Sequence, residues 1–206
     1  MSEQQLFEEI TLHLLEDEEP SIFLEKKSKE KDFSASQLNI LNELKKTEQS
    51  KQHHPEGNVW IHTMMVVDEA AKIRDISKDP KAFMWGALLH DIGKPDTTRL
   101  RKGKITAYDH DKVGAKKAED LLNRMGVEED FINKVVALVR WHMQILFVSK
   151  NMAFADVKEM QKQTDIEEVA LLGQCDRLGR LHVNREEVME DIQNFLDKIK
   201  KNSRDR

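Results

Sequence analysis

The sequence predicts an all-α protein, a helical bundle with an N-terminal helical extension. Proline and glycine are scarce, at 4 and 8 of 206 residues, so few positions favour turns or interrupt helices. The many lysines and glutamates favour helix over sheet, and apolar residues recur at the three- and four-residue spacing of helix faces. Sheet is therefore expected to be minor or absent.

The first predicted helix covers roughly residues 3–15 and carries an apolar stripe opposite Glu8 and Glu9. Four residues form the stripe: Leu6, Phe7, Ile10 and Leu14. Pro20 interrupts the pattern after an acidic run, and a charged stretch follows it.

A second helix is expected after a serine cap, provided by Ser34 or Ser36. Its apolar positions are Leu38, Ile40, Leu41 and Leu44. Polar residues 47–53 then indicate a linker.

Two apolar segments in the middle of the chain are predicted to be buried helices. The first, residues 59–73, places His62 among apolar neighbours at helical spacing. The second, residues 82–92, is apolar almost all round and is stopped by a glycine and a proline. His90 and Asp91 therefore lie on the last turn of a central helix.

The downstream part is predicted to be helical after a basic loop, residues 96–108, which turns at Gly103. Asp109 or Asp111 is expected to open the next helix, which ends at Gly126. The remaining helices are expected over about 128–143 and 154–163, from the cap Asp165 through Asp176, and from Asn184 with Glu187 as a capping pair. We divide the chain into an N-terminal extension (1–52), a central domain (53–183) and a C-terminal helix with a basic tail (184–206).

Composition excludes several kinds of site. A single cysteine, Cys175, rules out an internal disulfide and a thiolate cage, so a metal site must use nitrogen and oxygen ligands. The net charge of -5 argues against broad electrostatic capture of nucleic acid and favours a small substrate. The N-terminus does not resemble a signal peptide, and we expect no apolar run to approach the roughly 20 residues that span a bilayer. We therefore expect a cytoplasmic protein without membrane contact.

His90 and Asp91 stand next to each other in an otherwise apolar segment. An unpaired buried carboxylate is costly, so Asp91 requires a neutralising partner. A lone His-Asp pair is explained equally well by a hydrogen-bonded core histidine. Four further polar residues lie among or beside apolar neighbours: His62, His110, His142 and Asp176. Such side chains on separate helices can satisfy one another by converging on a divalent ion.

Three runs of this sequence resemble the motifs of the HD superfamily of phosphohydrolases, in particular the HD domain attached to many bacterial CCA-adding tRNA nucleotidyltransferases. They are HPEGNVWIHT (54–63), LHDIGKP (89–95) and DRLGR (176–180). The resemblance covers about residues 53–180, leaves residues 1–52 outside and implies an HD-domain helical bundle. No strand-rich nucleotidyltransferase head is recognised, so we expect a free-standing HD module that does not add CCA.

The resemblance also implies the ligands of one or two divalent ions. It assigns a first ion to four residues: His62, His90, Asp91 and Asp176. His110 and His142 match the further histidines of members that hold two ions, with Asp91 bridging. A second ion stays open at this point, because Met143 and Gln144 stand where two-metal members often have another histidine. Iron, manganese, nickel, zinc and magnesium all remain candidates.

Asp91 and Lys94 are the candidate catalytic residues, and Lys94, Arg177 and Arg180 the candidate phosphate-binding residues. Lys94 has a second interpretation, since it can simply complement the negative end of its helix. Arg180 can likewise pair with a surface acid. Glu56 is a candidate supporting residue behind the ligands.

The function implied is hydrolysis of a phosphoester in a nucleotide or at an RNA end, by a phosphomonoesterase or a 2',3'-cyclic phosphodiesterase. One alternative is a non-catalytic sensor that binds metal or nucleotide. Another is an RNA-handling module, which would use a basic face made of Lys94, Arg99, Arg101, Lys102 and Lys104. The same bases suit a rim that steers phosphate. The exact substrate, the ion, the oligomeric state and the role of residues 1–52 are left undetermined by the sequence.

Overall fold

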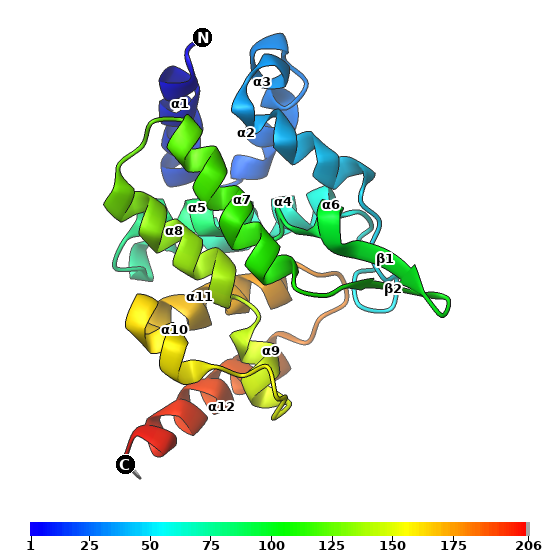
Figure 1. Ribbon diagram of the computed structural model, residues 1–206, viewed down its shortest axis with the longest axis vertical. Helices are drawn as coiled ribbons and strands as arrows, with labels where there is room; N and C mark the ends of the chain where they lie inside the picture. Colours follow the sequence, from blue (N-terminus) through cyan, green and yellow to red (C-terminus); the bar gives the residue numbers. More distant parts are fainter. Residues whose placement is uncertain (205–206) are drawn as a thin grey trace.

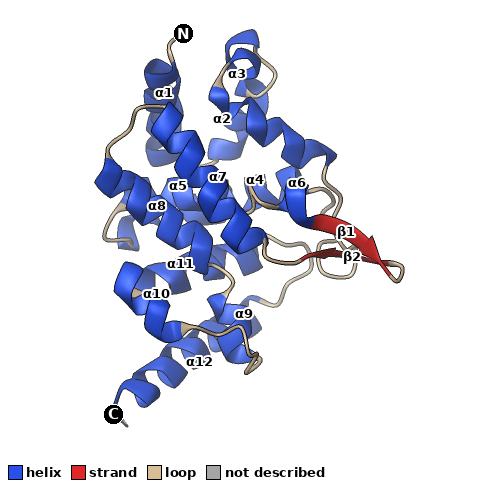
Figure 2. Cartoon of the chain, viewed as in Figure 1, coloured by secondary structure: helices blue, strands red, loops and turns tan. Residues whose placement is uncertain are grey.

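A computed structural model describes residues 1–204 and confirms an all-α fold. Helices account for 69% of the chain, and the described residues contain one two-stranded sheet (Figures 1 and 2). The last two residues of the expected basic tail lie outside the described part.

The expected helices are present in the expected order, and short helices and two strands that were not expected lie between them. Before the central helices come α1 (Glu3–Glu16), α2 (Pro20–Lys27), α3 (Lys31–Ala35) and the 3-10 helix η1 (Gln37–Lys46). The middle of the chain forms α4 (Val59–Ala71), η2 (Arg74–Ile76), α5 (Pro80–Leu89), α6 (Lys94–Thr97), β1 (Thr98–Arg101) and β2 (Lys104–Ala107). The rest forms α7 (His110–Arg124), α8 (Glu129–Trp141), α9 (Gln144–Ser149), α10 (Val157–Gln163), α11 (Ile166–Leu178) and α12 (Arg185–Arg204).

Helix α5 lies at the centre of the bundle, as its apolar sequence predicts. Every residue from Ala82 to Leu89 is buried, because α4, α8, α1 and α11 pack around it. Helices α7 and α8 pair along one side, while α9, α10 and α12 lie at the end opposite α1 and α3 (Figure 1). The last turn of α5 is thereby enclosed from several directions.

The N-terminal helices belong to the same hydrophobic core as the central ones. Phe7 of α1 stacks on Trp85 of α5 with ring centroids 4.7 Å apart. Leu24, Phe33 and Leu38 are fully buried in the core cluster that also contains the central helices. A second cluster joins α12 to the end of α8 and to α9, α10 and α11. The expected boundaries after residues 52 and 183 stay a prediction.

Two local expectations for the first 50 residues need adjustment. Pro20 does not merely interrupt, because it occupies the first turn of α2, where its missing N–H costs nothing. Of the two candidate caps, Ser36 is the one used: its Oγ accepts from the backbone N–H of Leu38. The helix that follows Ser36 is a 3-10 helix.

The prediction that residues 96–108 form a loop is wrong, because residues 98–107 form a β-hairpin. Thr98 pairs with Ala107 and Arg101 pairs with Lys104 in antiparallel register. Lys102 and Gly103 both have positive φ, at 49° and 74°, as a tight two-residue hairpin turn requires. Gly103 is at the turn as predicted, but the strand pairing on either side of it was not foreseen.

The expectation that no apolar stretch approaches membrane-spanning length is also wrong. The stretch Glu129–Ser149 is long and apolar enough by length and composition, but 61% of the tested window is buried inside the protein. Helices within a protein core pass the same test, so the stretch is weak evidence for a membrane span.

Gly93 allows the end of α5 to approach α7. A Cβ atom at this position would lie 2.2 Å from the His110 carbonyl oxygen and 2.5 Å from the Gly114 nitrogen. Both neighbours are backbone atoms of α7, so they cannot move aside without moving the helix. Gly93 therefore sets the spacing between the Asp91 turn and the start of α7.

We predict that Gly93→Ala lowers the free energy of unfolding by about 3 kcal/mol, because the added methyl forces the two backbones apart. Gly126→Ala is the control: Gly126 has a φ of 72° with open space around its Cβ position, so only conformational strain of about 1 kcal/mol is expected. Urea denaturation followed by circular dichroism measures both. Equal losses in the two variants would contradict the close-approach argument.

Candidate metal centre

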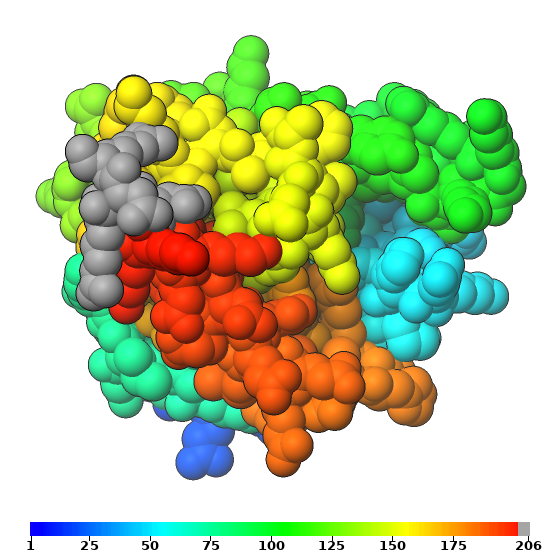
Figure 3. All heavy atoms as spheres, turned by 90° about the horizontal axis from the view of Figure 1, so that it is seen from below, coloured from blue at the N-terminus to red at the C-terminus, as the bar shows by residue number. Residues whose placement is uncertain are grey.

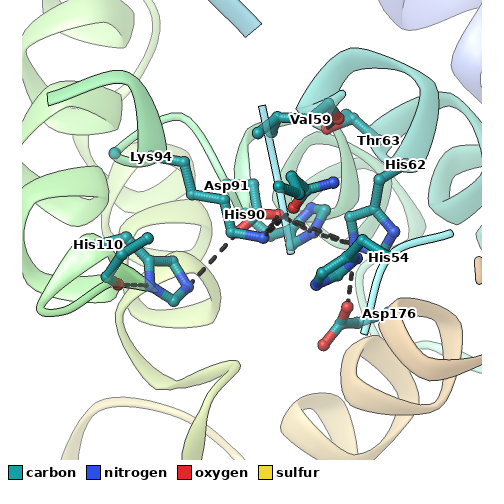
Figure 4. A network of polar contacts seen from close by, with 12 residues as sticks. His54, Val59, His62, Thr63, His90, Asp91, Lys94, His110 and Asp176 are labelled. Atoms are coloured by element: carbon teal, nitrogen blue, oxygen red, sulfur yellow. Dashed lines mark hydrogen bonds and ion pairs between the residues drawn. The ribbon is translucent and has the colours of Figure 1, made fainter. Parts of the chain in front are cut away.

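The fold brings together all six candidate metal ligands. His62 lies on α4, His90 and Asp91 follow the end of α5, and Asp176 lies near the end of α11. His110 begins α7 and His142 follows α8. All six are buried, and Figure 4 shows five of them converging on one interior region.

The first group surrounds the Nε2 atom of His62. This atom lies 3.0 Å from Asp176 Oδ1, 3.4 Å from His90 Nε2 and 3.8 Å from Asp91 Oδ2. His90 Nε2 is 3.2 Å from the same Asp91 oxygen. Donor atoms of His62, His90 and Asp91 thus lie within 4.8 Å of one another, and Asp176 adjoins this group through His62.

The second group lies on the other side of the Asp91 carboxylate. His110 Nε2 and His142 Nε2 are 3.2 Å apart, and they lie 3.4 and 3.9 Å from Asp91 Oδ1. The two oxygens of Asp91 therefore face different histidine pairs. Asp91 thus belongs to both groups that could hold a metal.

Three of the histidines are oriented by the same kind of local hydrogen bond. His90, His110 and His142 each turn Nδ1 toward the backbone carbonyl three residues earlier, at 2.7 to 2.8 Å. An Nδ1–H that donates to a carbonyl leaves the Nε2 lone pair free and pointing inward. The Nε2 atoms are thereby directed into the cluster, where they could hold a metal.

These donors fit a divalent ion. Two nitrogens each about 2.1 Å from a tetrahedral ion lie about 3.4 Å apart, which matches the Nε2 separations of 3.2 and 3.4 Å. Lone pairs this close repel unless a positive charge lies between them. Imidazole nitrogens and carboxylate oxygens suit zinc, manganese, iron or nickel, so the donor set does not select one metal.

Burial and neighbouring charges keep the second group in the required ionisation state. Burial lowers the pKa of His142 to about 3 and also lowers the pKa of His110. Both rings are therefore neutral at neutral pH. Burial opposes ionisation of Asp91, but the Lys94 ammonium and His90 outweigh it and hold the Asp91 pKa well below its usual range.

His62 is oriented by a carboxylate as well as by a carbonyl. Its Nδ1 lies 3.1 Å from both Glu56 Oε1 and the Gly179 carbonyl oxygen. Although burial opposes it, the carboxylates of Asp176 and Glu56 raise the pKa of His62, so this position favours positive charge. A cation at Nε2 would satisfy the Asp176 carboxylate as a proton there does, while Glu56 faces Nδ1.

Glu56 holds two histidines at once, since Oε1 also lies 2.8 Å from Nδ1 of His54. Despite burial, hydrogen bonds from His62 and His54 lower the pKa of Glu56 to about 2. Its Oε2 is buried without a hydrogen-bond partner among the described residues. The sequence indicated Glu56 as a supporting residue, whereas the contact of His54 with it was missed.

Two of the three candidate phosphate-binding cations lie at the cluster. Lys94 Nζ is 2.6 Å from Asp91 Oδ2 and 2.6 Å from Gln49 Oε1. One Arg180 nitrogen lies 2.8 and 3.0 Å from the two oxygens of Asp176. The structure does not bring Arg177 to the site, because its guanidinium pairs with Asp191 of α12.

Sequence reasoning missed Gln49 and the ion pair between Asp111 and Arg140. Gln49 belongs to a polar segment that was interpreted as a linker, yet its side chain is buried against Lys94. The Asp111–Arg140 pair joins α7 to α8 next to His110 and His142. The sequence offered as a local signal for this pair an aspartate one residue after His110 and an arginine two residues before His142.

A helical bundle that gathers histidines and aspartates from several helices into its interior is a class of fold used for metal-dependent hydrolysis. The family model of the HD domain matches residues 59–181, and the chain therefore belongs to the HD domain family. The HD domain defines a superfamily of metal-dependent phosphohydrolases.

Several curated relatives carry the name "Multifunctional CCA protein". The protein from Actinobacillus pleuropneumoniae serotype 5b is 34% identical over 96 residues, which are 46% of this chain and 22% of the relative. The protein from Aromatoleum aromaticum is 32% identical over 117 residues, covering 57% of this chain and 27% of the relative. The chain thus spans about a quarter of the length of these relatives, within their HD region.

We predict that Glu56→Gln weakens metal binding about 10- to 100-fold, because the neutral amide no longer supports the charge on His62. Titration calorimetry of metal-stripped protein with Mn²⁺ measures the change. Glu43→Gln is the matched control, since Glu43 is exposed and pairs only with Lys46 on the surface. Affinities within twofold of each other for Glu56→Gln and the unaltered protein would show that Glu56 does not support a ligand.

Proposed function

We propose that this protein is a metal-dependent phosphohydrolase that acts on a phosphoester of a nucleotide or an RNA end. The observation that carries the proposal is the pair of buried donor groups that share Asp91, with Lys94 beside them. An anionic substrate needs cations at the reacting centre, and the cluster can gather both metal and side-chain cations. Membership of the HD family supports the same reaction class.

The ligand set fits two divalent ions. His62, His90 and Asp176 would hold the first with Asp91 Oδ2, and His110 and His142 the second with Asp91 Oδ1. Bound divalent ions supply a nucleophilic water near neutral pH and neutralise phosphoryl oxygens. The proposed role of Asp91 is to bridge the two positions.

The protein's own cations complete the proposed substrate site. Lys94 Nζ lies on the Asp91 side of the cluster and Arg180 on the Asp176 side, so the two can bind different oxygens of one phosphate. Lys94 Nζ also donates to Gln49 Oε1, which lies on the segment between η1 and α4. Arg177 has no part in this proposal, because Asp191 takes its guanidinium.

The nucleotide or RNA-end substrate is proposed from the relatives. Their printed name concerns CCA, and the HD-domain match of this chain, residues 59–181, includes the proposed ligands. The match covers only part of those proteins, so CCA addition itself is not proposed. A cytoplasmic location fits such substrates and is part of the proposal.

We expect metal-stripped protein, reloaded separately with Mn²⁺, Ni²⁺, Fe²⁺, Zn²⁺ or Mg²⁺, to hydrolyse 2',3'-cyclic nucleotides or nucleoside monophosphates. His90→Ala and Asp91→Ala should each lower kcat/KM more than about 100-fold, because each removes a ligand. His182→Asn is the control, since His182 is exposed and its left-handed backbone tolerates asparagine. Tight metal binding without turnover of any of these substrates would contradict the hydrolase proposal and favour a non-catalytic metal-binding sensor.

A count of bound ions tests the two-metal arrangement separately from activity. We expect two Mn²⁺ ions per chain by elemental analysis after gel filtration, and one in the His142→Ala variant. His142 faces Asp91 Oδ1 and is not among the donors grouped with His62, so the first position should keep its ion. A single ion in the unaltered protein would restrict the centre to the group around His62.

A further inference from the structure

The β1–β2 hairpin joins two parts of the candidate metal centre. It begins directly after α6, whose first residue is Lys94, and the chain returns from it to His110. Figure 1 shows the hairpin projecting from the helical body, and Figure 3 shows this segment beside the one near residue 50, at the edge of a hollow. A molecule held by the hairpin therefore lies close to the proposed site of hydrolysis.

The hairpin carries an unneutralised positive charge. Four bases, Arg99, Arg101, Lys102 and Lys104, are exposed, and residues 98–107 contain no acid. None of the four makes an ion pair with a residue in the described part of the chain. By contrast, the neighbouring Lys112 and Lys117 pair with Asp109 and Asp96. In a chain of net charge -5, this is a local departure from the overall acidity.

The hairpin also presents an exposed aromatic ring. Tyr108, the single tyrosine of the chain, follows β2 and is 62% exposed. The Arg101 guanidinium lies 5.1 Å from the centre of its ring, so one face is supported from the hairpin. Tyr108 precedes His110 by two residues, so along the chain it lies between the basic strands and the candidate metal centre.

We propose that the β1–β2 hairpin and Tyr108 form a binding arm for single-stranded RNA, and that the arm presents the end of the strand to the metal centre. Phosphates of the nucleotides next to the end pair with the four bases, and Tyr108 stacks on a base. Single-stranded RNA offers both a charged backbone and unpaired bases, whereas an acidic peptide offers no equivalent partner for the exposed ring. This inference rests on the proposed function, because it identifies the phosphoesters that the proposed hydrolase would receive as those at the ends of single-stranded RNA.

The size of the arm predicts local rather than extensive binding. Four bases neutralise at most four phosphates, so the logarithm of the association constant should fall with the logarithm of salt concentration with a slope no steeper than about -3. The acidity of the rest of the chain opposes any wider contact. A short oligonucleotide therefore suffices as a probe.

The test compares binding and hydrolysis in a hairpin variant. The probe is a fluorescein-labelled oligoribonucleotide that ends in a 2',3'-cyclic phosphate, and its binding is measured by anisotropy at several salt concentrations. The variant replaces all four bases by glutamine. Its matched control removes the same charge from exposed lysines elsewhere, by glutamine at Lys29, Lys72, Lys78 and Lys162.

We expect the hairpin variant to lose at least about 10-fold in oligonucleotide affinity and most of the salt dependence, while the control variant keeps both. The kcat/KM of the hairpin variant for 2',3'-cyclic AMP should stay within about twofold of that of the unaltered protein. Its kcat/KM for the oligonucleotide should fall by about as much as its affinity. Tyr108→Leu should weaken oligonucleotide binding at least about fivefold without changing the salt dependence.

Equal oligonucleotide binding by the hairpin variant and the control variant would overturn the inference. So would hairpin-dependent binding of phosphatidylserine vesicles or of a polyglutamate peptide that is tighter than that of the oligonucleotide. Binding of the oligonucleotide does not require turnover. Hairpin-dependent binding in a protein that hydrolyses nothing would therefore uphold the RNA arm and reject only the proposed enzyme.

Discussion

The buried carboxylate of Asp91 is the constraint on which the rest of this structure depends. It lies at the end of a helix enclosed on every side, where an uncompensated negative charge costs several kcal/mol. The Lys94 ammonium and His90 supply the compensation. The surrounding helices must therefore end or begin where their polar side chains reach this carboxylate, and their apolar faces hold them there. Packing and chemistry thus impose the same arrangement on the bundle.

The segments outside the family match support the candidate metal centre, because they position the helices and side chains that contact the candidate ligands. Helices α1 and α2 share the hydrophobic core with α4 and α5, so they fix the helices that carry His62 and Asp91. The segment between η1 and α4 places Gln49 against Lys94 and Glu56 against His62. Ligand positions in such a site depend on this outer layer, because a displacement of 1 Å changes metal geometry.

The convergence of the six candidate ligands was predictable from the sequence because their signal is local: polar residues stand in apolar helical runs, and the ordered motifs resemble a family. Their role as metal ligands stays a prediction. The central helix and the cap at Ser36 follow from the same short-range rules. The contacts behind the ligands join residues with no local signature, such as Gln49 with Lys94, or Asp111 with Arg140. The hairpin was missed because its strands hold only four residues each and present bases rather than an alternating apolar face.

Arg177 and Arg180 show how tertiary contacts decide between side chains that the sequence cannot distinguish. Both follow Asp176 within one turn, and both resemble phosphate ligands by type. Helix α12 packs on α11 and offers Asp191 to Arg177, which removes that guanidinium from the interior. Arg180 lies beyond the end of α11 and turns back to Asp176, so its charge stays with the buried cluster. The C-terminal helix thereby selects which of two similar cations faces the metal centre.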